Sequence, residues 1–324
     1  MSTIEQTMRA LTVPAWGADE PLRETHLPRP VPGPTEVLVA VRAAGVNPVD
    51  WKSRASGGFG MWDEPAILGW DVSGVVAEVG PGSTLFAVGD EVFGMPRFPR
   101  QAGAYAEYVV APARQLAPKP AALSHVEAAA LPLVGLTAWQ ALAEVAHVQP
   151  GERVLVHAAA GGLGHVAVQI ARALGASVVG TASAGKHALL RRLGVDEPID
   201  YTAVDFVTAT APVDVVLDTI GGDYARRSLA LLRDGGRLVS ITGPDAPGAE
   251  VEAAAAARGI RTGWTVVEPD RHGLLQLARL VDEGRLRPEI AAVLPLAEAD
   301  RAHQLGATNR TAGKIVLEVG DGDR

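Results

Sequence analysis

The segment from Arg153 to Ser183, RVLVHAAAGGLGHVAVQIARALGASVVGTAS, constrains the fold of this chain more than any other stretch. It opens with an apolar, β-branched run at 154–156, passes through a glycine-rich turn and a segment of helical period, and ends in a second apolar run at 177–181. This order of strand, glycine turn, helix and strand is typical of the βαβ unit that binds a dinucleotide. A helix beginning near Leu163 would direct its free N–H groups and its positive dipole end at a pyrophosphate.

The glycine turn reads AAGGLG over residues 159–164, so Ala159 stands at the first glycine position of the G-x-G-x-x-G pattern. Gly161 is expected to let the backbone approach a pyrophosphate, and Gly164 to let the helix pack close to the strand. A tight turn without a ligand is the alternative, because glycine turns between a strand and a helix are common. The apolar stripe that starts at Val166 with helical spacing favours the dinucleotide site.

The end of the second strand indicates NADPH rather than NADH. A site for NAD usually places an acidic residue about 20 residues beyond the glycines, where it holds the ribose 2′-hydroxyl. Here Ala182 occupies that place, and Ser183, Lys186 and His187 follow it. A hydroxyl group and a cation suit a 2′-phosphate, whereas a carboxylate would repel it. The alternative is that Ser183 only caps the next helix and that Lys186 is solvated.

Composition narrows the classes of protein. The 324 residues are enough for two domains, and 48% hydrophobic with 20% charged residues is typical of a globular protein. A net charge of -8 without a basic cluster argues against a nucleic-acid partner. There is no apolar run of about 18 residues, no pattern of a signal peptide and no cysteine, so we expect a cytoplasmic protein without a membrane segment or disulfides.

Two kinds of structure are expected along the chain. From residue 8 to about 110, short β-runs at 36–44, 72–79, 90–93 and 104–110 alternate with Pro and Gly turns, as in an antiparallel barrel or sandwich. The pattern changes at the capping box Ser124–Glu127. Beyond it, strands expected at 152–157, 177–181, 213–217, 236–241 and 260–266 alternate with helices, which predicts a parallel sheet covered on both faces. A helix after Asp270 and a strand at 314–319 complete the chain.

Seven further motifs occur in a fixed order. They are AGVNPVD at 44–50, LGWDVSGVV at 68–76, VGDEV at 88–92, GLTAW at 135–139, VLDTIGG at 216–222, GGRLV at 235–239 and AGKIVL at 312–317. With the glycine turn, this set resembles the medium-chain dehydrogenase/reductase superfamily, in its zinc-free quinone oxidoreductase-like branch. The resemblance implies an α/β protein in which a doubly wound Rossmann domain (124–267) is inserted in a GroES-like β-barrel catalytic domain (1–123 and 268–324).

The resemblance also implies that no zinc is bound. Zinc-dependent alcohol dehydrogenases of this superfamily hold the catalytic metal with Cys, His and Cys, near a Glu. The corresponding residues here are Asn47, Trp70 and Leu133, with Asp71 in place of the Glu, and the first three are poor zinc ligands. A conjugated carbonyl can accept hydride at carbon and delocalise the charge, so hydrogen-bond donors and a proton source replace the Lewis acid.

The same resemblance assigns residues of the catalytic domain. Asn47 is the candidate catalytic residue, beside the nicotinamide ribose and the reacting carbonyl, and its amide can donate a hydrogen bond; the alternative is an Asn that shapes the turn before Pro48. The candidate substrate-lining residues are Trp51, Lys52, Phe59 and Trp62. The alternatives are a core position for the first, a solvent-facing one for the second and a simple surface loop for the other two.

The candidate cofactor-binding residues come from the glycine turn, the strand ends and the resemblance. They are Asn47, Thr137, Ala159, Gly161, Gly162, Leu163, Gly164, Ser183, Lys186, Tyr201, Ile220, Thr242, Gly243, Trp264, Thr265, Val266 and Lys314. For Thr137 the alternative is a hydrogen bond within its own helix, and for Lys314 it is a surface cation.

The function expected from these features is zinc-independent, NADPH-dependent reduction of a quinone or an α,β-unsaturated carbonyl. An enoyl-thioester or polyketide-type enoyl reductase uses the same scaffold and is the first alternative. A non-catalytic NADPH-binding sensor or structural protein is the second. The strand at 260–267 has a single charged residue, Arg261, so we expect its edge to be covered in a homodimer.

Overall fold

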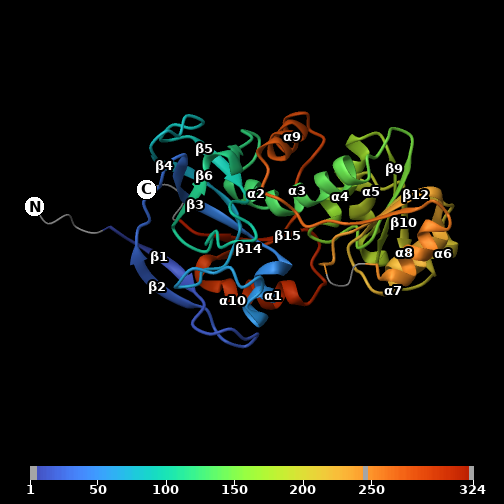
Figure 1. Cartoon of the computed structure of the whole chain (residues 1–324), viewed down its shortest axis with the longest axis horizontal. Helices are drawn as coiled ribbons and strands as arrows, with labels where there is room; N and C mark the ends of the chain where they lie inside the picture. Colours follow the sequence, from blue (N-terminus) through green and yellow to red (C-terminus); the bar gives the residue numbers. More distant parts are fainter. Residues whose placement is uncertain (1–5, 244–246, 321–324) are drawn as a thin grey trace, which may run out of the picture. The chain divides into compact units, whose positions relative to one another are not determined.

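The structure is a computed structural model that describes residues 6–243 and 247–320 (Figure 1). Its contacts divide the chain into two compact units. The first comprises the chain up to Leu133, residues 269–282 and the chain from Pro288 on, and the second comprises residues 134–268 and 283–287. The first boundary therefore lies after Leu133 rather than at the expected 123/124. The cause is helix α2 (His125–Ala129), which packs on strands of the first unit.

The second unit is built on a sheet of six parallel strands in the order β10-β9-β8-β11-β12-β13. The strands are β8 (Arg153–Val156), β9 (Ser177–Ala182), β10 (Glu197–Asp200), β11 (Val213–Asp218), β12 (Leu232–Ser240) and β13 (Arg261–Trp264). This order is that of the doubly wound Rossmann fold, and it reverses direction between β8 and β11. The predicted parallel sheet is confirmed, with β10 as a strand that the predicted ranges did not include.

Helices precede and connect these parallel strands. They are α3 (Pro132–Trp139), which continues into the π-helical segment η2 (Gln140–Val145), α4 (Gly164–Ala173), the 3-10 turn η3 (Ala184–Lys186), α5 (His187–Leu193), α6 (Phe206–Ala209), α7 (Asp223–Leu231) and α8 (Ala249–Ala256). One core cluster of this unit joins Leu155, Val179 and Val216 of the sheet to Phe206 and Leu229 of the helices, and all five side chains are buried.

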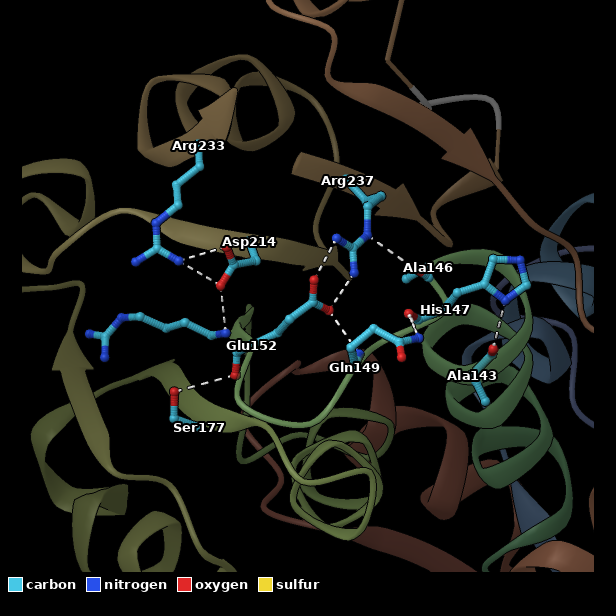
Figure 2. A network of polar contacts seen from close by, with 10 residues as sticks. Ala143, Ala146, His147, Gln149, Glu152, Ser177, Asp214, Arg233 and Arg237 are labelled. Atoms are coloured by element: carbon cyan, nitrogen blue, oxygen red, sulfur yellow. Dashed lines mark hydrogen bonds and ion pairs between the residues drawn. The ribbon is translucent and has the colours of Figure 1, made fainter. Parts of the chain in front are cut away.

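An ion-pair network joins the amino ends of three of the strands (Figure 2). Arg237 of β12 donates two hydrogen bonds to Glu152, at 2.8 and 2.5 Å, and a third, at 2.9 Å, to the carbonyl oxygen of Ala146. Asp214 of β11 accepts from the backbone N–H of Arg153 at 2.8 Å and from the guanidinium of Arg233 at 2.6 Å. These contacts fix the strand ends opposite to those from which the glycine turn emerges.

The first unit contains a seven-stranded sheet in the order β14-β15-β3-β4-β5-β7, with β6 also paired to β3. The strands are β3 (Glu36–Val46), β4 (Asp71–Val79), β5 (Glu91–Gly94), β6 (Tyr108–Pro112), β7 (Leu116–Pro118), β14 (Ile290–Pro295) and β15 (Lys314–Glu318), and a separate antiparallel pair joins β1 (Thr7–Thr12) to β2 (Arg23–Pro28). The pairings are antiparallel except that of β14 with β15.

Helices α1 (Pro48–Ser56), α9 (Arg271–Asp282) and α10 (Ala299–Ala307) belong to the first unit with α2 and the 3-10 turns η1 (Ala113–Gln115) and η5 (Leu296–Glu298). The capping box predicted at Ser124 is confirmed, because its side chain accepts the N–H of Glu127 while the Glu127 carboxylate accepts the N–H of Ser124. In the sheet, β15 pairs with residues 43–46 of β3, so a segment from late in the chain completes an early strand.

Candidate functional site

The predicted cofactor residues of the second unit follow the carboxyl ends of its strands. The glycine turn follows β8, Ser183 and Lys186 follow β9, Tyr201 follows β10, Ile220 follows β11, Thr242 and Gly243 follow β12, and Trp264 to Val266 end β13 and follow it. Because the strands are parallel, their carboxyl ends meet at one edge of the sheet, which is where ligands of doubly wound folds bind. The structure thus brings these residues to one edge, next to the reversal point between β8 and β11.

The geometry of the glycine turn explains its sequence. A Cβ atom at Gly164 would lie 2.3 Å from the carbonyl oxygen of Ala158, so only glycine allows α4 to begin here. Ala159 is buried, and its methyl group would lie 2.9 Å from a Cβ atom at position 180, where β9 has Gly180. The alanine at the first glycine position of the motif is therefore accommodated by a glycine on the neighbouring strand. Gly162 and Leu163 complete the turn and are partly exposed.

The turn after β9 presents a hydroxyl group and an ammonium group. Ala182, at the position of the usual acidic residue, is buried. Ser183 precedes η3, and its side chain makes no capping hydrogen bond. This observation does not support the alternative that Ser183 only caps a helix. Burial lowers the pKa of Lys186, a half-buried side chain. The carboxylate of Asp200, at the end of β10, accepts hydrogen bonds from Thr202 and from the backbone of Ala184, and these bonds lower its pKa.

Apolar and aromatic side chains are exposed at this edge. Trp264 is 52% exposed, and Tyr201, Ile220 and Val266 are each exposed by more than two fifths. Thr242 and Thr265 are tied to β12 through Ser240, whose Oγ lies 2.9 Å from the Thr242 hydroxyl and whose carbonyl oxygen accepts the N–H of Thr265. Thr137, in α3, is buried. Large exposed apolar side chains beside polar groups are typical of a ligand-binding edge.

The first unit contains a buried charged centre around Asn47. The Asn47 side chain is fully buried; its Nδ2 donates to Asp71 at 2.9 Å, and its Oδ1 accepts from the ammonium group of Lys314. Lys314 also donates to the carbonyl oxygen of Val46 at 2.8 Å, and its Nζ lies 3.5 Å from Asp71 Oδ2. Asp71 Oδ1 accepts the backbone N–H of Leu133 at 2.7 Å.

This centre rules out one alternative for Lys314 and defines the hydrogen bonds of Asn47. Lys314 is 2% exposed, so it is not a surface cation. Its partners in the structure are Asn47, Asp71 and a backbone carbonyl group, all of the first unit. The Asn47 amide has both its oxygen and its nitrogen engaged, so its free donor capacity is one N–H rather than a whole amide group. The residue nevertheless stands at the N-cap of α1, where the alternative of a turn-shaping Asn before Pro48 also holds.

The positions that correspond to zinc ligands hold other groups. The Trp70 side chain is fully buried, and its indole N–H donates to the carbonyl oxygen of Arg100 at 2.8 Å. Leu133 has an aliphatic side chain, and its backbone N–H donates to Asp71 Oδ1. Within residues 6–243 and 247–320, no group of three His, Asp or Glu side chains has the arrangement of a metal site. The buried cation of this centre is the ammonium group of Lys314.

The four predicted substrate-lining residues have different environments. Lys52 faces solvent. Trp51 packs on the core and on α10, where a Cβ atom at Gly306 would lie 2.7 Å from its ring, which favours the core alternative. Phe59 is 46% exposed and meets Phe98 edge to face, with 5.5 Å between ring centroids.

Trp62 belongs to a chain of aromatic rings rather than to an isolated surface loop. Its ring centroid lies 5.2 Å from that of Trp16 and 5.5 Å from that of Trp70, and Trp70 in turn lies 5.3 Å from Phe98. The Trp62 indole N–H donates to the carbonyl oxygen of Gly57 at 2.7 Å. This chain runs from the fully buried Trp70 to the exposed Trp16 and Phe59, so it presents aromatic surface at both ends.

Sequence reasoning missed three residues of the buried centre, which are Asp50, Tyr105 and His303. Asp50 accepts the backbone N–H of Asn47 at 2.7 Å, and the hydroxyl group of Tyr105 lies 3.1 Å from His303 Nε2. All three side chains are at most 3% exposed. A buried Asp is an informative observation, but its burial depends on contacts between segments distant in the sequence.

Among the described residues, no helix has the length and apolar character needed to cross a membrane.

Comparisons with known proteins agree with this architecture. A family model for the GroES-like domain of alcohol dehydrogenases matches residues 33–121, and one for zinc-binding dehydrogenases matches residues 193–317. The structure of the quinone oxidoreductase from Coxiella burnetii aligns with a TM-score of 0.90 and 36% identity, covering 97% of this chain and 100% of that one.

Two curated relatives extend the comparison. The 2-haloacrylate reductase of a Burkholderia species is 35% identical over 88% of this chain and 91% of its own length. The pikromycin polyketide synthase component PikAII of Streptomyces venezuelae is 38% identical over 92% of this chain but only 8% of its own. The chain spans between 5% and 13% of the length of four curated synthases of this kind that it matches. The chain therefore belongs to the medium-chain dehydrogenase/reductase superfamily, in its zinc-free quinone oxidoreductase-like branch.

Proposed function

We propose that this oxidoreductase uses NADPH to transfer hydride to a quinone or an α,β-unsaturated carbonyl compound, without a metal ion. The observation that carries the proposal is the buried centre of Asn47, Asp71 and Lys314, which holds an ammonium group and lacks metal ligands at the positions of zinc-dependent relatives. A conjugated acceptor needs no Lewis acid, because the charge left by the hydride is delocalised. The similarity to a quinone oxidoreductase and to a 2-haloacrylate reductase supports the same class of acceptor.

The preference for NADPH rests on the turn after β9. Ser183 and the half-buried Lys186 supply a hydroxyl group and a cation, and Ala182 supplies no carboxylate. A charge-assisted hydrogen bond to a 2′-phosphate is worth about 1.5–3 kcal/mol, which corresponds to roughly 10- to 150-fold in affinity. Lys186→Ala is therefore expected to weaken NADPH by this factor and NADH far less.

Fluorescence titration of the purified protein with each nucleotide measures this preference. Arg191→Ala, which removes a cation from the exposed face of α5 a few residues away, is the matched control and is expected to leave both affinities unchanged. Equal weakening of NADPH and NADH by Lys186→Ala would contradict the assignment of Lys186 to the 2′-phosphate.

A second candidate function is the reduction of an enoyl thioester. Identity of 38% to a polyketide synthase component over nearly the whole chain favours it. NADPH oxidation measured in parallel with 1,4-benzoquinone, 9,10-phenanthrenequinone and a crotonyl thioester separates the two acceptor classes. A protein that binds NADPH but oxidises it with none of the three would instead be a sensor or structural protein.

We also propose a homodimer paired through β13. This strand is an edge of the described six-stranded sheet, and Arg261 is its single charged residue. An exposed edge of this kind is usually covered. Sedimentation equilibrium at micromolar concentration measures the assembly, and a single species with the mass of one chain would exclude the dimer. Cytoplasmic residence stays a prediction from the sequence.

A further inference from the structure

The charged groups in the buried centre of the first unit do not balance. Asp50 and Asp71 are fully buried, and Lys314 is 2% exposed, so two carboxyl groups share one ammonium group. Asp71 is the compensated carboxylate, because it accepts hydrogen bonds from Asn47 Nδ2 and the backbone of Leu133 and lies 3.5 Å from Lys314 Nζ. A second uncompensated carboxylate would be costly at such a site. Burial raises the pKa of both Asp50 and Asp71. We place the proton that restores balance on Asp50, because both oxygens of Asp71 accept hydrogen bonds and Asp50 Oδ1 accepts none.

The two oxygens of Asp50 have unequal surroundings. Oδ2 accepts the backbone N–H of Asn47 at 2.7 Å, which holds the carboxyl group against the start of α1. Oδ1 is buried and has no hydrogen-bond partner at bonding geometry. The Tyr105 hydroxyl group is the side-chain donor that acts on this carboxyl group: it lowers the pKa of Asp50, and the carboxyl group raises the pKa of Tyr105. Oδ1 is therefore the carboxyl oxygen that is left to hold the proton.

A chain of side chains fixes the direction of the Tyr105 hydroxyl hydrogen. Tyr105 Oη lies 3.1 Å from His303 Nε2, and His303 Nδ1 lies 3.5 Å from Arg54 Nη1. A guanidinium group can only donate, so Nδ1 is the acceptor and the proton of the neutral imidazole is on Nε2. That N–H donates to Tyr105 Oη, and the hydrogen of the hydroxyl group is left to point at Asp50.

Arg54 ends this chain and prevents it from conducting protons. Its Nη1 also pairs with Asp300 Oδ1 at 2.9 Å, and its Nε donates to the carbonyl oxygen of Glu20 at 2.9 Å. Burial, assisted by Arg54, lowers the pKa of His303 to about 3, so the imidazole stays neutral throughout the working range of pH. Because a guanidinium cannot accept a proton, the chain orients a hydroxyl group and does not carry protons to the surface.

We propose that Arg54, His303 and Tyr105 are positioning residues, which aim one hydroxyl hydrogen at Asp50 and thereby lower the pH at which this buried carboxyl group gives up its proton. The consequence for catalysis rests on the proposed function. Hydride transfer to a conjugated carbonyl leaves negative charge on the acceptor, and a centre that is balanced while Asp50 is protonated tolerates this charge better than one with an extra negative charge.

The groups around Asp50 agree with titration near neutrality. Burial raises the pKa of Asp50 to about 7; the N–H of Asn47, Lys314 and Tyr105 oppose the rise, and Asp71 adds to it. Removing the Tyr105 hydroxyl removes an influence that lowers the pKa, so the titration of Asp50 moves to higher pH. Removing the His303 ring frees the hydroxyl hydrogen to turn away and has the same sign.

The decisive measurement is the titration of carboxyl groups in the ligand-free protein, by NMR with 13C-labelled aspartate. One resonance is expected to titrate with a midpoint near pH 7 and to vanish in Asp50→Asn. Tyr105→Phe and His303→Leu are expected to move that midpoint to higher pH. His303→Gln is the conservative rescue, because its amide oxygen can accept from Arg54 and its N–H can donate to Tyr105, and it is expected to keep the wild-type midpoint.

Matched controls separate this effect from general changes of the first unit. Tyr108→Phe and His26→Gln alter the same residue types at exposed or half-buried positions and are expected to leave the midpoint unchanged. In the reductase assay with 9,10-phenanthrenequinone, kcat/KM of the wild type is expected to fall as pH rises through the midpoint. That fall is expected to shift upward in Tyr105→Phe and to be absent in Asp50→Asn.

The positioning chain and the proposed function can be refuted separately. The positioning chain is wrong if no aspartate titrates near pH 7. It is also wrong if the Asp50 midpoint is the same in folded Tyr105→Phe and His303→Leu as in the wild type, and neither result depends on reductase activity. If either variant fails to fold, the remaining one and the His303→Gln comparison decide the same question. A midpoint that moves as described in a protein without reductase activity would uphold the chain and refute the proposed function.

Discussion

Replacing Gly164 by alanine tests whether the glycine turn is built for close packing of helix on strand. A Cβ atom at this position would lie 2.3 Å from Ala158 O, 2.7 Å from Ala159 Cα and 2.9 Å from Ala158 C. All three are backbone atoms of the turn, so no side chain can rotate away. Restoring ordinary contact requires the start of α4 to move by about 1 Å relative to the turn.

The cost of that movement can be placed between limits. Overpacking of a close-packed site costs about 1–3 kcal/mol, and the higher helix propensity of alanine returns less than about 1 kcal/mol at the first residue of a helix. Each kcal/mol lowers Tm by roughly 2–4 °C, so after the gain in helix propensity is subtracted we expect Gly164→Ala to unfold measurably below the wild type, by up to roughly 12 °C.

Thermal unfolding followed by far-UV circular dichroism measures this difference, with two matched variants. Gly185→Ala adds a methyl group with nothing within 4 Å and is expected to keep the wild-type Tm. Gly161→Ala meets only the carbonyl oxygen of Ala158, at 3.1 Å, so it is expected to affect stability little and NADPH affinity strongly. A Gly164→Ala protein as stable as Gly185→Ala would refute the packing argument.

Three further outcomes are expected. Gly45→Ala places a Cβ atom 2.3 Å from the carbonyl oxygen of Ala129, and thermal unfolding is expected to show a loss of about 1–3 kcal/mol in the first unit. Arg237→Met leaves Glu152 without its two guanidinium bonds, and urea unfolding at pH 7 is expected to show a loss of about 1–3 kcal/mol, less than for a fully buried pair because both side chains keep some exposure. Burial raises the pKa of Glu152, but the hydrogen bonds from Arg237 outweigh burial and leave this pKa below its usual value. The loss should therefore shrink as the pH falls, because protonation of Glu152 removes the stabilisation. Asp50 has the opposite sign: its pKa is raised from 3.8 to about 7, so its cost to folding grows between these values and is complete above pH 7, and Asp50→Asn is expected to flatten the stability profile across this window.

The sequence was sufficient for the parallel sheet because its strands are apolar and β-branched. The exception is β10, which reads Glu-Pro-Ile-Asp, because its two charged residues and its proline do not fit the pattern of a strand. It forms because Ile199 is buried beside Thr181 of β9, a contact that local pattern cannot show. The domain boundary was placed too early for a related reason: the capping box marks where a helix begins, not which unit that helix packs against.

The two halves of the candidate site differed in how far they could be predicted. The cofactor edge follows from strand order alone, because each predicted residue comes directly after a parallel strand. The buried centre does not. Lys314 lies 267 residues from Asn47 and 243 from Asp71, and nothing in the local sequence AGKIVL distinguishes a buried ammonium group from a surface one. The contact of Tyr105 with His303 spans 198 residues and is equally hidden.

The pairing of β15 with β3 imposes an order of events on biosynthesis. Lys314 is separated by 268 residues from Val46, whose carbonyl oxygen it contacts, so residues 43–46 leave the ribosome long before their strand partner exists. All six strands of the Rossmann sheet lie between 153 and 264 and are translated before β15. That sheet can form during synthesis, before β15 is available to pair with β3 and before Lys314 is available to Asp71. Late closure of so distant a contact slows folding, and it prolongs the time during which an unpaired strand edge is exposed.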